Sequence, residues 1–246
     1  MRLWKQSRPR NSLQEGEVHL WRVRLDMADI ALCRLRGMLS EEEARRSERF
    51  RFPVLQRRFA AGRGALRAIL AGYLSAEPEH LRFAYSAHGK PFLRDSQHDI
   101  QFNLSHSGDL MVVAVCRNWP IGVDIEKEDR QLHPLEIAER YFSDRERDEI
   151  ASADTGNRNG VFFQLWTAKE AILKAASVGL ALELSKVEIG LRPLRVVALD
   201  EKAKIEGAIW HLVGFRPGKV YSGTLAVAGL PTHLECCDFL STSDRL

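Results

Sequence analysis

The stretch Pro120-Ile-Gly-Val-Asp-Ile-Glu126 is the most informative part of the sequence. Its β-branched residues, which follow a turn signal, predict a strand. Side chains at alternate positions of a strand point to the same face, so we expect Asp124 and Glu126 to lie side by side. Two carboxylates held close together repel each other and are stable mainly with a proton or a cation between them. The pair therefore predicts a cation site.

A second acidic motif, Trp166-Thr-Ala-Lys-Glu-Ala171, lies in a predicted helix that spans about residues 161–177. Glu170 is followed four residues later by Lys174, so the two side chains share one helix face. This spacing is also that of an ordinary surface ion pair, worth about 0.3 kcal/mol. If the same face is turned towards Asp124 and Glu126, it adds a third carboxylate and a cation. Such a set of groups suits magnesium and a phosphate.

Hydrophobic patterns and capping signals predict a mixture of helices and strands. Capping boxes at Ser40–Glu43 and Ser143–Glu146 predict two helix starts, and an amphipathic pattern predicts a helix over about residues 55–74. The long helix over 161–177 is expected to end at Gly179. Strands are predicted at 17–26, 101–105, 110–116, 187–191, 194–199, 209–215 and 219–228, with hairpins at 107–109 and 217–218.

The two halves of the chain resemble each other, because each reads as helices followed by antiparallel strands. We therefore predict an α+β fold with two similar subdomains, residues 1–117 and 118–246. The first would carry arginine-rich helices, and the second would carry the acidic residues and the long helix. The site is expected in a cleft between the two.

The composition is that of a globular protein, with 45% hydrophobic and 28% charged residues. No apolar run approaches the roughly 18 residues of a transmembrane helix. The basic residues 1–11 lack the apolar core of a signal peptide, which predicts a cytoplasmic protein. The four cysteines show neither Cys-x-x-Cys spacing nor nearby histidines, so we expect incidental thiols in place of a zinc site or disulfides.

The net charge of +3 is distributed unevenly along the chain. Residues 45–67 contain eight arginines and a single acid, Glu48. Such a segment suits phosphates or an acidic protein surface, and a solvated helix face explains it equally well. A nucleic-acid-binding module is a further alternative, but the segment lacks the interleaved stacking aromatics of a recognised binding motif.

Two turns carry candidate phosphate-binding residues. His106 is expected just after the strand that Ser105 ends, where the two residues could form charge-assisted hydrogen bonds with a phosphate. Gly89 and Lys90 belong to a Gly-Lys-Pro turn, in which the glycine permits close backbone approach to a ligand and the lysine is a point charge. Each signal is weak by itself, because idle histidines and such turns are common.

Taken in order, four motifs resemble those of the 4′-phosphopantetheinyl transferase superfamily, and most of all its long, pseudo-dimeric Sfp-type branch. The motifs are His88-Gly-Lys-Pro-Phe-Leu93, Phe102-Asn-Leu-Ser-His-Ser107, Ile121-Gly-Val-Asp-Ile-Glu126 and Trp166-Thr-Ala-Lys-Glu-Ala-Ile-Leu-Lys-Ala175. The resemblance covers about residues 40–190. It implies transfer of the phosphopantetheine arm of coenzyme A to a serine of an apo acyl or peptidyl carrier protein, with release of adenosine 3′,5′-bisphosphate.

The resemblance also implies roles for individual residues. Asp124, Glu126 and Glu170 would hold magnesium, or manganese in its place, and Glu170 would be the general base, directly or through water. Lys174 would stabilise charge on the reacting phosphate. The implied contacts with coenzyme A are Arg46, Arg58, Gly89, Lys90, Ser105, His106, Asp124 and Lys174. Glu43 stands where some relatives carry a basic phosphate contact.

The resemblance implies a cytoplasmic monomer whose macromolecular partners are carrier proteins, with neither nucleic acid nor membrane as a partner. Because carrier proteins present an acidic helix, part of the arginine-rich segment or a nearby apolar surface is expected to meet it. The alternative is a catalytically silent homologue that binds coenzyme A or a carrier protein. Such a homologue is expected to have lost part of the acidic trio, which this chain retains.

Overall fold

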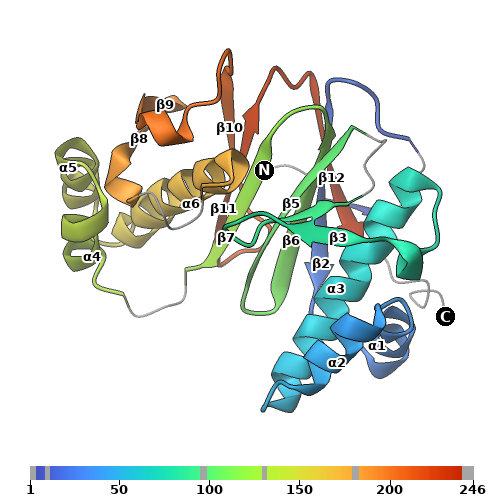
Figure 1. Cartoon of the computed structure of the whole chain (residues 1–246). Helices are drawn as coiled ribbons and strands as arrows, with labels where there is room; N and C mark the ends of the chain where they lie inside the picture. Colours follow the sequence, from blue (N-terminus) through green and yellow to red (C-terminus); the bar gives the residue numbers. More distant parts are fainter. Residues whose placement is uncertain (1–3, 9–11, 95–98, 129–131, 179–182, 240–246) are drawn as a thin grey trace.

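The computed structural model of this protein describes residues 4–8, 12–94, 99–128, 132–178 and 183–239. Two sheets form the middle of the molecule, and helices flank them on opposite sides (Figure 1). The first sheet has the strand order β1 (Lys5–Ser7), β12 (His233–Phe239), β2 (Glu17–Arg24), β6 (Leu110–Arg117) and β5 (Ile100–Ser107). The second has the order β10 (Trp210–Phe215), β11 (Tyr221–Ala228) and β7 (Ile121–Lys127).

Most neighbouring strands are antiparallel, as predicted. The hairpin predicted at residues 107–109 is confirmed, because β5 ends at Ser107, β6 begins at Leu110 and Gly108 has a φ of 56°. Strand β12 was not predicted, and it lies parallel to both of its neighbours, β1 and β2. The C-terminal segment therefore completes the sheet of the N-terminal half.

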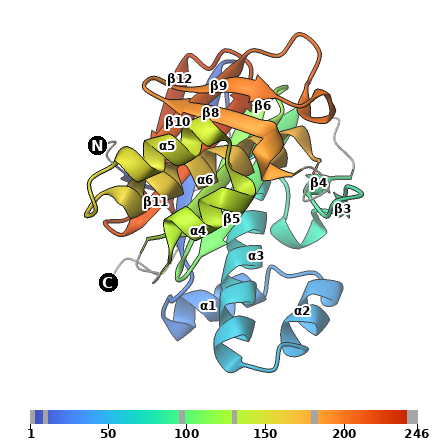
Figure 2. The same ribbon diagram turned by 90° about the vertical axis from the view of Figure 1, so that its left-hand side faces the viewer.

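Each sheet has its own long helix. Helix α3 (Pro53–Leu74) joins α1 (Asp29–Arg36) and α2 (Glu41–Glu48) in a helical arm that extends beyond the five-stranded sheet (Figures 1 and 2). Helix α6 (Arg158–Ala176) packs on the three-stranded sheet, with α4 (Pro134–Tyr141) and α5 (Asp144–Ser152) on its outer side. Both predicted capping boxes are confirmed. The helices α1 and α4 were not predicted, because eight residues show too little periodicity.

Shorter elements complete the described parts of the chain. Two-stranded sheets are formed by β3 (Phe83–Tyr85) with β4 (Pro91–Leu93) and by β8 (Val187–Leu191) with β9 (Leu194–Leu199). Single 3₁₀ turns are η1 (Pro78–His80), η3 (Leu184–Lys186) and η4 (Glu201–Ala203). The predicted α+β class is confirmed. Within the described residues no helix is both long and apolar enough to cross a membrane.

Buried apolar side chains form three clusters, and one of them is shared by both sheets. The first lies between α3 and the five-stranded sheet, and the second surrounds α6. The third contains side chains of β2 and β6 from one sheet together with side chains of β7 and β11 from the other, among them Leu20, Val112, Val123, Ile125 and Leu225. Burial of this common cluster joins the two halves into one body.

Helix α6 ends earlier than the sequence predicted. Its last helical residue is Ala176, and Ser177 forms the left-handed cap with a φ of 59°. The predicted cap, Gly179, lies outside the described residues. A left-handed cap is usually a glycine, because other residues pay a steric cost for this conformation, so the sequence pointed to the wrong residue.

Glycine 122 sets the distance between α6 and β7. A Cβ atom at Gly122 would lie 1.9 Å from the carbonyl oxygen of Ala171 and 2.5 Å from the backbone nitrogen of Ala175. Only glycine therefore lets the backbone of α6 lie directly on the strand. The contact holds Glu170 and Lys174, which lie on the same stretch of helix, close to Asp124.

We expect Gly122→Ala to lower the free energy of unfolding by about 3 kcal/mol, because the atoms that the new methyl group meets are backbone atoms. Urea unfolding measures this change. Gly156→Ala is the matched control, since no atom lies within 4 Å of a Cβ atom there. Equal unfolding free energies for the two variants would show that α6 does not depend on this close approach.

Candidate functional site

Three side chains of β5 hold the edge of β7. The backbone N–H groups of Val123, Ile125 and Lys127 donate hydrogen bonds to side-chain oxygens of β5, and the acceptors are Asn103 Oδ1 at 2.9 Å, Ser105 Oγ at 3.3 Å and Ser107 Oγ at 3.1 Å. We call these three bonds the side-chain ladder. β5 and β7 are edge strands of different sheets, and the ladder satisfies donors that an edge leaves open. It places the motif around Ser105 directly beside the motif around Asp124.

Asp124 and Lys174 form the centre of the site. Lys174 Nζ lies 2.6 Å from Asp124 Oδ1 and 3.1 Å from Ser105 Oγ. The Ser105 hydroxyl donates to the same carboxylate oxygen at 2.8 Å. Asp124 is buried, whereas Lys174 is partly open to solvent. The structure thus brings together three predicted residues from β5, β7 and α6.

The other oxygen of Asp124 is left without a partner. Asp124 Oδ2 is buried, and no hydrogen bond to it is made by the described residues. A buried carboxylate oxygen without a donor is costly, and a native structure rarely keeps one without a reason. A bound cation would satisfy this oxygen.

Glu126 lies two residues further along β7 and is held in the same way as Asp124. The Ser107 hydroxyl donates to Glu126 Oε2 at 2.9 Å. The prediction that Asp124 and Glu126 share a face of β7 is therefore confirmed by their partners, which are alternate serines of one neighbouring strand. The spacing of residues on both strands repeats every two positions, so the serines and acids meet in matching pairs.

Glu170 adds the third carboxylate from α6. Its pKa is raised, first because it is partly buried and then because it feels the charges of Asp124 and Glu126, although Lys174 acts in the opposite direction. The carboxylates therefore lie within electrostatic range of one another, as predicted. Thr167 fixes this part of the helix, since its hydroxyl lies 2.9 Å from that of Thr224 on β11.

These groups fit a cation that they share with another ligand. Among the described residues, no three His, Cys, Asp or Glu side chains converge closely enough to hold a metal ion by themselves. The Lys174 ammonium occupies the position next to Asp124 Oδ1, and Asp124 Oδ2 remains open to a cation. Magnesium binds through one or two carboxylates together with substrate phosphates and waters, so a partial protein shell suits it.

His106 and Arg58 lie at the edge of this cluster. The sequence placed His106 after a strand, but it lies within β5, opposite Met111. Surrounding protein atoms lower the pKa of His106, and the charges of Lys174 and Arg58 lower it further, while Glu126 opposes them. Arg58 pairs with Asp109 at 2.5 Å, and its buried Nε atom has no partner among the described residues. An anion next to both side chains would supply the missing acceptor and favour the charged imidazole.

Lys90 is less available to a ligand than the sequence suggested. Its ammonium donates to the carbonyl oxygens of Ile121 at 3.1 Å and Ala175 at 3.3 Å. Burial lowers the pKa of Lys90 to about 8. The lysine thereby ties its turn to β7 and to the end of α6. Gly89 has a φ of 81° and open space beside it, which agrees with the predicted close approach of a ligand to the backbone.

Arg46 lies in a different setting, on the wall of a cavity of about 470 Å³ between α2, α3 and β3. Its guanidinium packs over the ring of Phe59. Glu43 binds two other arginines of this wall, Arg63 at 2.6 Å and Arg67 at 2.5 Å. The residue that departs from the family pattern therefore neutralises charge inside this cavity. A larger cavity of about 900 Å³ lies near β2, α1 and residues 217–221, and none of the predicted site residues lines it.

Sequence reasoning missed the ion pair that supports Glu170 from behind. Lys169 and Glu146 are both fully buried, and Lys169 Nζ lies 2.6 Å from Glu146 Oε2. Lys169 also donates to the carbonyl oxygens of Leu184 and Val187. Glu146 accepts hydrogen bonds from the backbone of Ser143 and Ile189. The pair fixes the rotation of α6 and with it the direction of Glu170, and the capping box at Glu146 was the only sequence signal for it.

Comparisons with known proteins match both halves of the chain. The family model described as "4′-phosphopantetheinyl transferase superfamily" matches residues 120–227. The family model described as "4′-phosphopantetheinyl transferase, N-terminal" matches residues 28–118. The chain is 41% identical over 230 residues to 4′-phosphopantetheinyl transferase HetI of Nostoc sp., covering 92% of this chain and 94% of that protein.

Two further relatives come from Bacillus species. The 4′-phosphopantetheinyl transferase psf-1 of Bacillus pumilus is 36% identical over 153 residues, which cover 61% of this chain and 63% of the relative. The 4′-phosphopantetheinyl transferase Sfp of Bacillus subtilis is 31% identical over 167 residues, which cover 68% of this chain and 73% of the relative. The HetI match spans nearly the whole chain and so includes every residue of the site.

We expect Glu146→Gln to lower the free energy of unfolding by about 3–5 kcal/mol, because it leaves the Lys169 ammonium buried without a counter-charge. Urea unfolding measures the loss. Glu201→Gln is the control, since it removes the carboxylate of an exposed pair with Lys204 and should cost less than about 1 kcal/mol. A loss no larger than that of the control would contradict the supporting role of the buried pair.

Proposed function

The chain belongs to the 4′-phosphopantetheinyl transferase superfamily, and on this premise we propose that the cluster of Asp124, Lys174 and Glu170 performs the transfer. The substrates are coenzyme A and an apo acyl or peptidyl carrier protein. The serine oxygen of the carrier attacks the phosphorus that bears the pantetheine arm, and the bond from that phosphorus to the nucleotide breaks. The products are the phosphopantetheinylated carrier and adenosine 3′,5′-bisphosphate.

One observation carries this proposal. Asp124 is buried, and Lys174 and Ser105 bind its Oδ1 atom. Its Oδ2 atom has no hydrogen-bond partner among the described residues. The charges of Asp124 and Glu126 both act on the Glu170 carboxyl group and raise its pKa. Three carboxylates beside a lysine make a site that favours a metal-bound phosphate, whose negative charge pairs with the ammonium and whose metal pairs with the acids.

The residues of the protein act mainly by positioning and by charge. Asp124, Glu126 and Glu170 would hold magnesium, or manganese in its place, together with pyrophosphate oxygens of the substrate. When bound, the metal supplies positive charge that offsets the charge of the reacting phosphate. Lys174 supplies a further positive charge from the protein, and because Asp124 and Ser105 already fix its ammonium, little ordering is needed during the reaction.

Glu170 is suited to accept the proton of the carrier serine. Its raised pKa makes it a stronger base than an ordinary glutamate, and its carboxylate is only partly buried. The proton moves to Glu170 directly or through a water as the serine oxygen forms its bond to phosphorus. Lys169 and Thr167, on the same helix, keep the carboxylate in place.

His106 and Arg58 would bind the phosphates at the nucleotide end of coenzyme A. The unpartnered Nε of Arg58 and the positive charges of Lys174 and Arg58 near His106 support this assignment. In this arrangement a phosphate contact of Ser105 would replace its hydrogen bond to Asp124, because a hydroxyl has one proton to donate. Arg46 and the backbone at Gly89 would complete the contacts with the nucleotide.

We expect Asp124→Ala and Glu170→Ala to abolish transfer while leaving the fold intact, because each removes a carboxylate from the reacting centre. Incubation with coenzyme A, magnesium and an apo carrier protein, followed by mass spectrometry, detects the gain of the phosphopantetheine mass. Glu201→Ala, an exposed acid remote from the site, is the control and should retain full activity. Near-normal transfer by both site variants would sink the assignment.

We also expect magnesium binding to release protons. Because the pKa of Glu170 is raised, its carboxyl group keeps its proton to a higher pH than an ordinary glutamate does, and a metal ion must displace any proton that remains. Calorimetric titration in the presence of adenosine 3′,5′-bisphosphate, repeated in buffers of different ionisation enthalpy, should show more proton release at about pH 6 than at about pH 8.

The variant Glu170→Gln provides the comparison for this titration, since its amide has no proton to lose in that range. The difference in proton release between the two pH values should shrink in this variant. An unchanged difference would mean that another group titrates on metal binding.

A further inference from the structure

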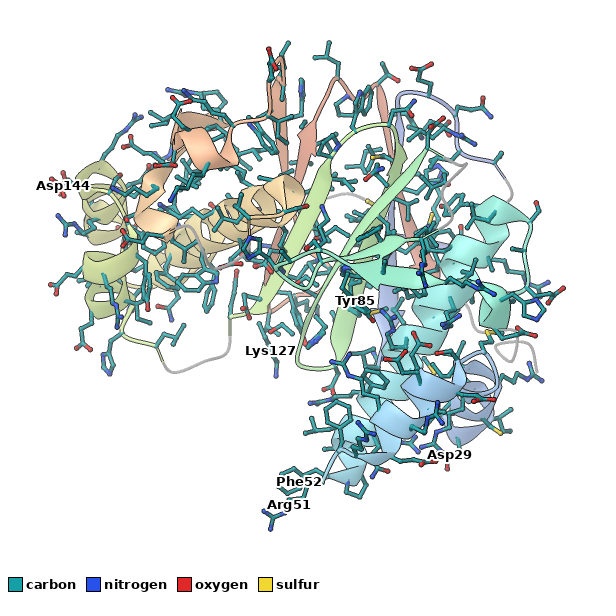
Figure 3. The ribbon with its side chains drawn as sticks, viewed as in Figure 1. Asp29, Arg51, Phe52, Tyr85, Lys127 and Asp144 are labelled. Atoms are coloured by element: carbon teal, nitrogen blue, oxygen red, sulfur yellow. The ribbon has the colours of Figure 1, made fainter. Side chains whose placement is uncertain are left out.

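The connection between α2 and α3 projects from the molecule as an exposed tip, which we define as residues 49–55. Figure 3 shows Arg51 and Phe52 at the far end of the helical arm, with their side chains directed away from the rest of the protein. The segment joins the end of α2 to the first turn of α3, which begins at Pro53. The tip is therefore open to a partner from several directions.

The tip exposes three large apolar side chains close together. Phe52 is 55% exposed, Val54 is 50% exposed and Leu55 is 39% exposed. The buried face of α3 begins only at Ala60. Scattered exposed apolar residues need no explanation, but a group at one projecting end is typical of an interaction surface.

Positive charge surrounds these apolar side chains. Arg49 and Arg51 are exposed, and Glu48 is the single acid between residues 45 and 67. No carboxylate of the described residues pairs with Arg49 or Arg51, whereas the later arginines of α3 bind Asp29, Asp109 and Glu43. The charge of the tip is therefore available to another molecule.

A chain of contacts links the tip to the reacting centre. Arg58 lies one turn after Leu55 on α3, about 4.5 Å further along the helix axis. Arg58 binds Asp109 in the turn that follows Ser107, and Ser107 binds Glu126. The first turns of α3 thus connect the tip to the end of β5 that carries the site.

We propose that residues 49–55 dock the carrier protein, by contacting a region of its surface where apolar side chains are flanked by aspartates and glutamates. The inference rests on the proposed function, since the transfer needs a second protein held beside the site while its serine reaches the phosphate. The apolar side chains supply burial, and Arg49 and Arg51, with which no described carboxylate pairs, select an acidic partner. Arginine and aromatic residues are also the types that contribute most at such contacts.

The test compares a tip variant, Arg51→Glu with Phe52→Ser, with a control variant that makes the same kinds of change on a remote surface. Lys202→Glu with Ile209→Ser serves as the control, because Ile209 is 57% exposed and lies near η4 and β10. We expect the KM of the tip variant for the apo carrier to rise about tenfold. The KM for coenzyme A should stay within about twofold of the wild-type value. The unfolding midpoint should equal that of wild type within error.

A charge swap makes the test specific. Reversing exposed acids of the carrier to lysine should weaken its use by wild type and should restore part of its use by Arg51→Glu. Such recovery would support docking at the tip.

Two outcomes would overturn the inference while leaving the function intact. One is transfer with an unchanged carrier KM in the tip variant. The other concerns vesicles of phosphatidylcholine and phosphatidylglycerol. If wild type binds these vesicles and the tip variant does not, while the carrier KM is the same for both, the tip would be assigned to a membrane surface. A wild-type protein that transfers nothing to any apo carrier would instead overturn the function, and the docking surface with it.

Discussion

Strands β5 and β7 belong to different sheets, and three side chains of β5 make the hydrogen bonds that a neighbouring backbone would otherwise make. Asn103, Ser105 and Ser107 accept from alternate N–H groups of β7, so the two halves keep a fixed register without forming one continuous sheet. A shift by one residue would leave three donors unpaired, two of them buried. The shared apolar cluster beneath the ladder makes the same register favourable.

The ladder also orients the acids of β7 beside one another. Ser105 uses its two acceptor positions for Ile125 and Lys174 and its proton for Asp124, so its hydroxyl is fully engaged. Ser107 serves Lys127 and Glu126 in the same way. Each serine thus supports the backbone of β7 and orients one carboxylate. Structural and chemical roles meet in the same side chains, so the contact between the halves also sets the geometry of the site.

What could be predicted from the sequence was what depends on neighbours in the chain. The alternation in residues 120–126 placed the acids on one face, and the capping boxes marked two helix starts. The residues of the site could be predicted because each of their motifs lies on or beside a helix or strand. The ladder, the buried Lys169–Glu146 pair and the engagement of Lys90 by two carbonyl oxygens are contacts between distant segments, and no local pattern specifies them. Ser177 in place of a glycine cap likewise depends on how α6 meets the rest of the protein.

Strand β12 lies between β1 and β2, and His233 at its start pairs with Glu17 near the other end of the chain. Contacts of such large sequence separation are costly in chain entropy and form late. During synthesis the five-stranded sheet has a gap until β12 has left the ribosome, and the edges of β1 and β2 stay open for that time. The helical arm and the hairpin of β5 and β6 are local and can form earlier. The five-stranded sheet is therefore completed only by a strand that follows both halves, although the sequence reads as two consecutive halves.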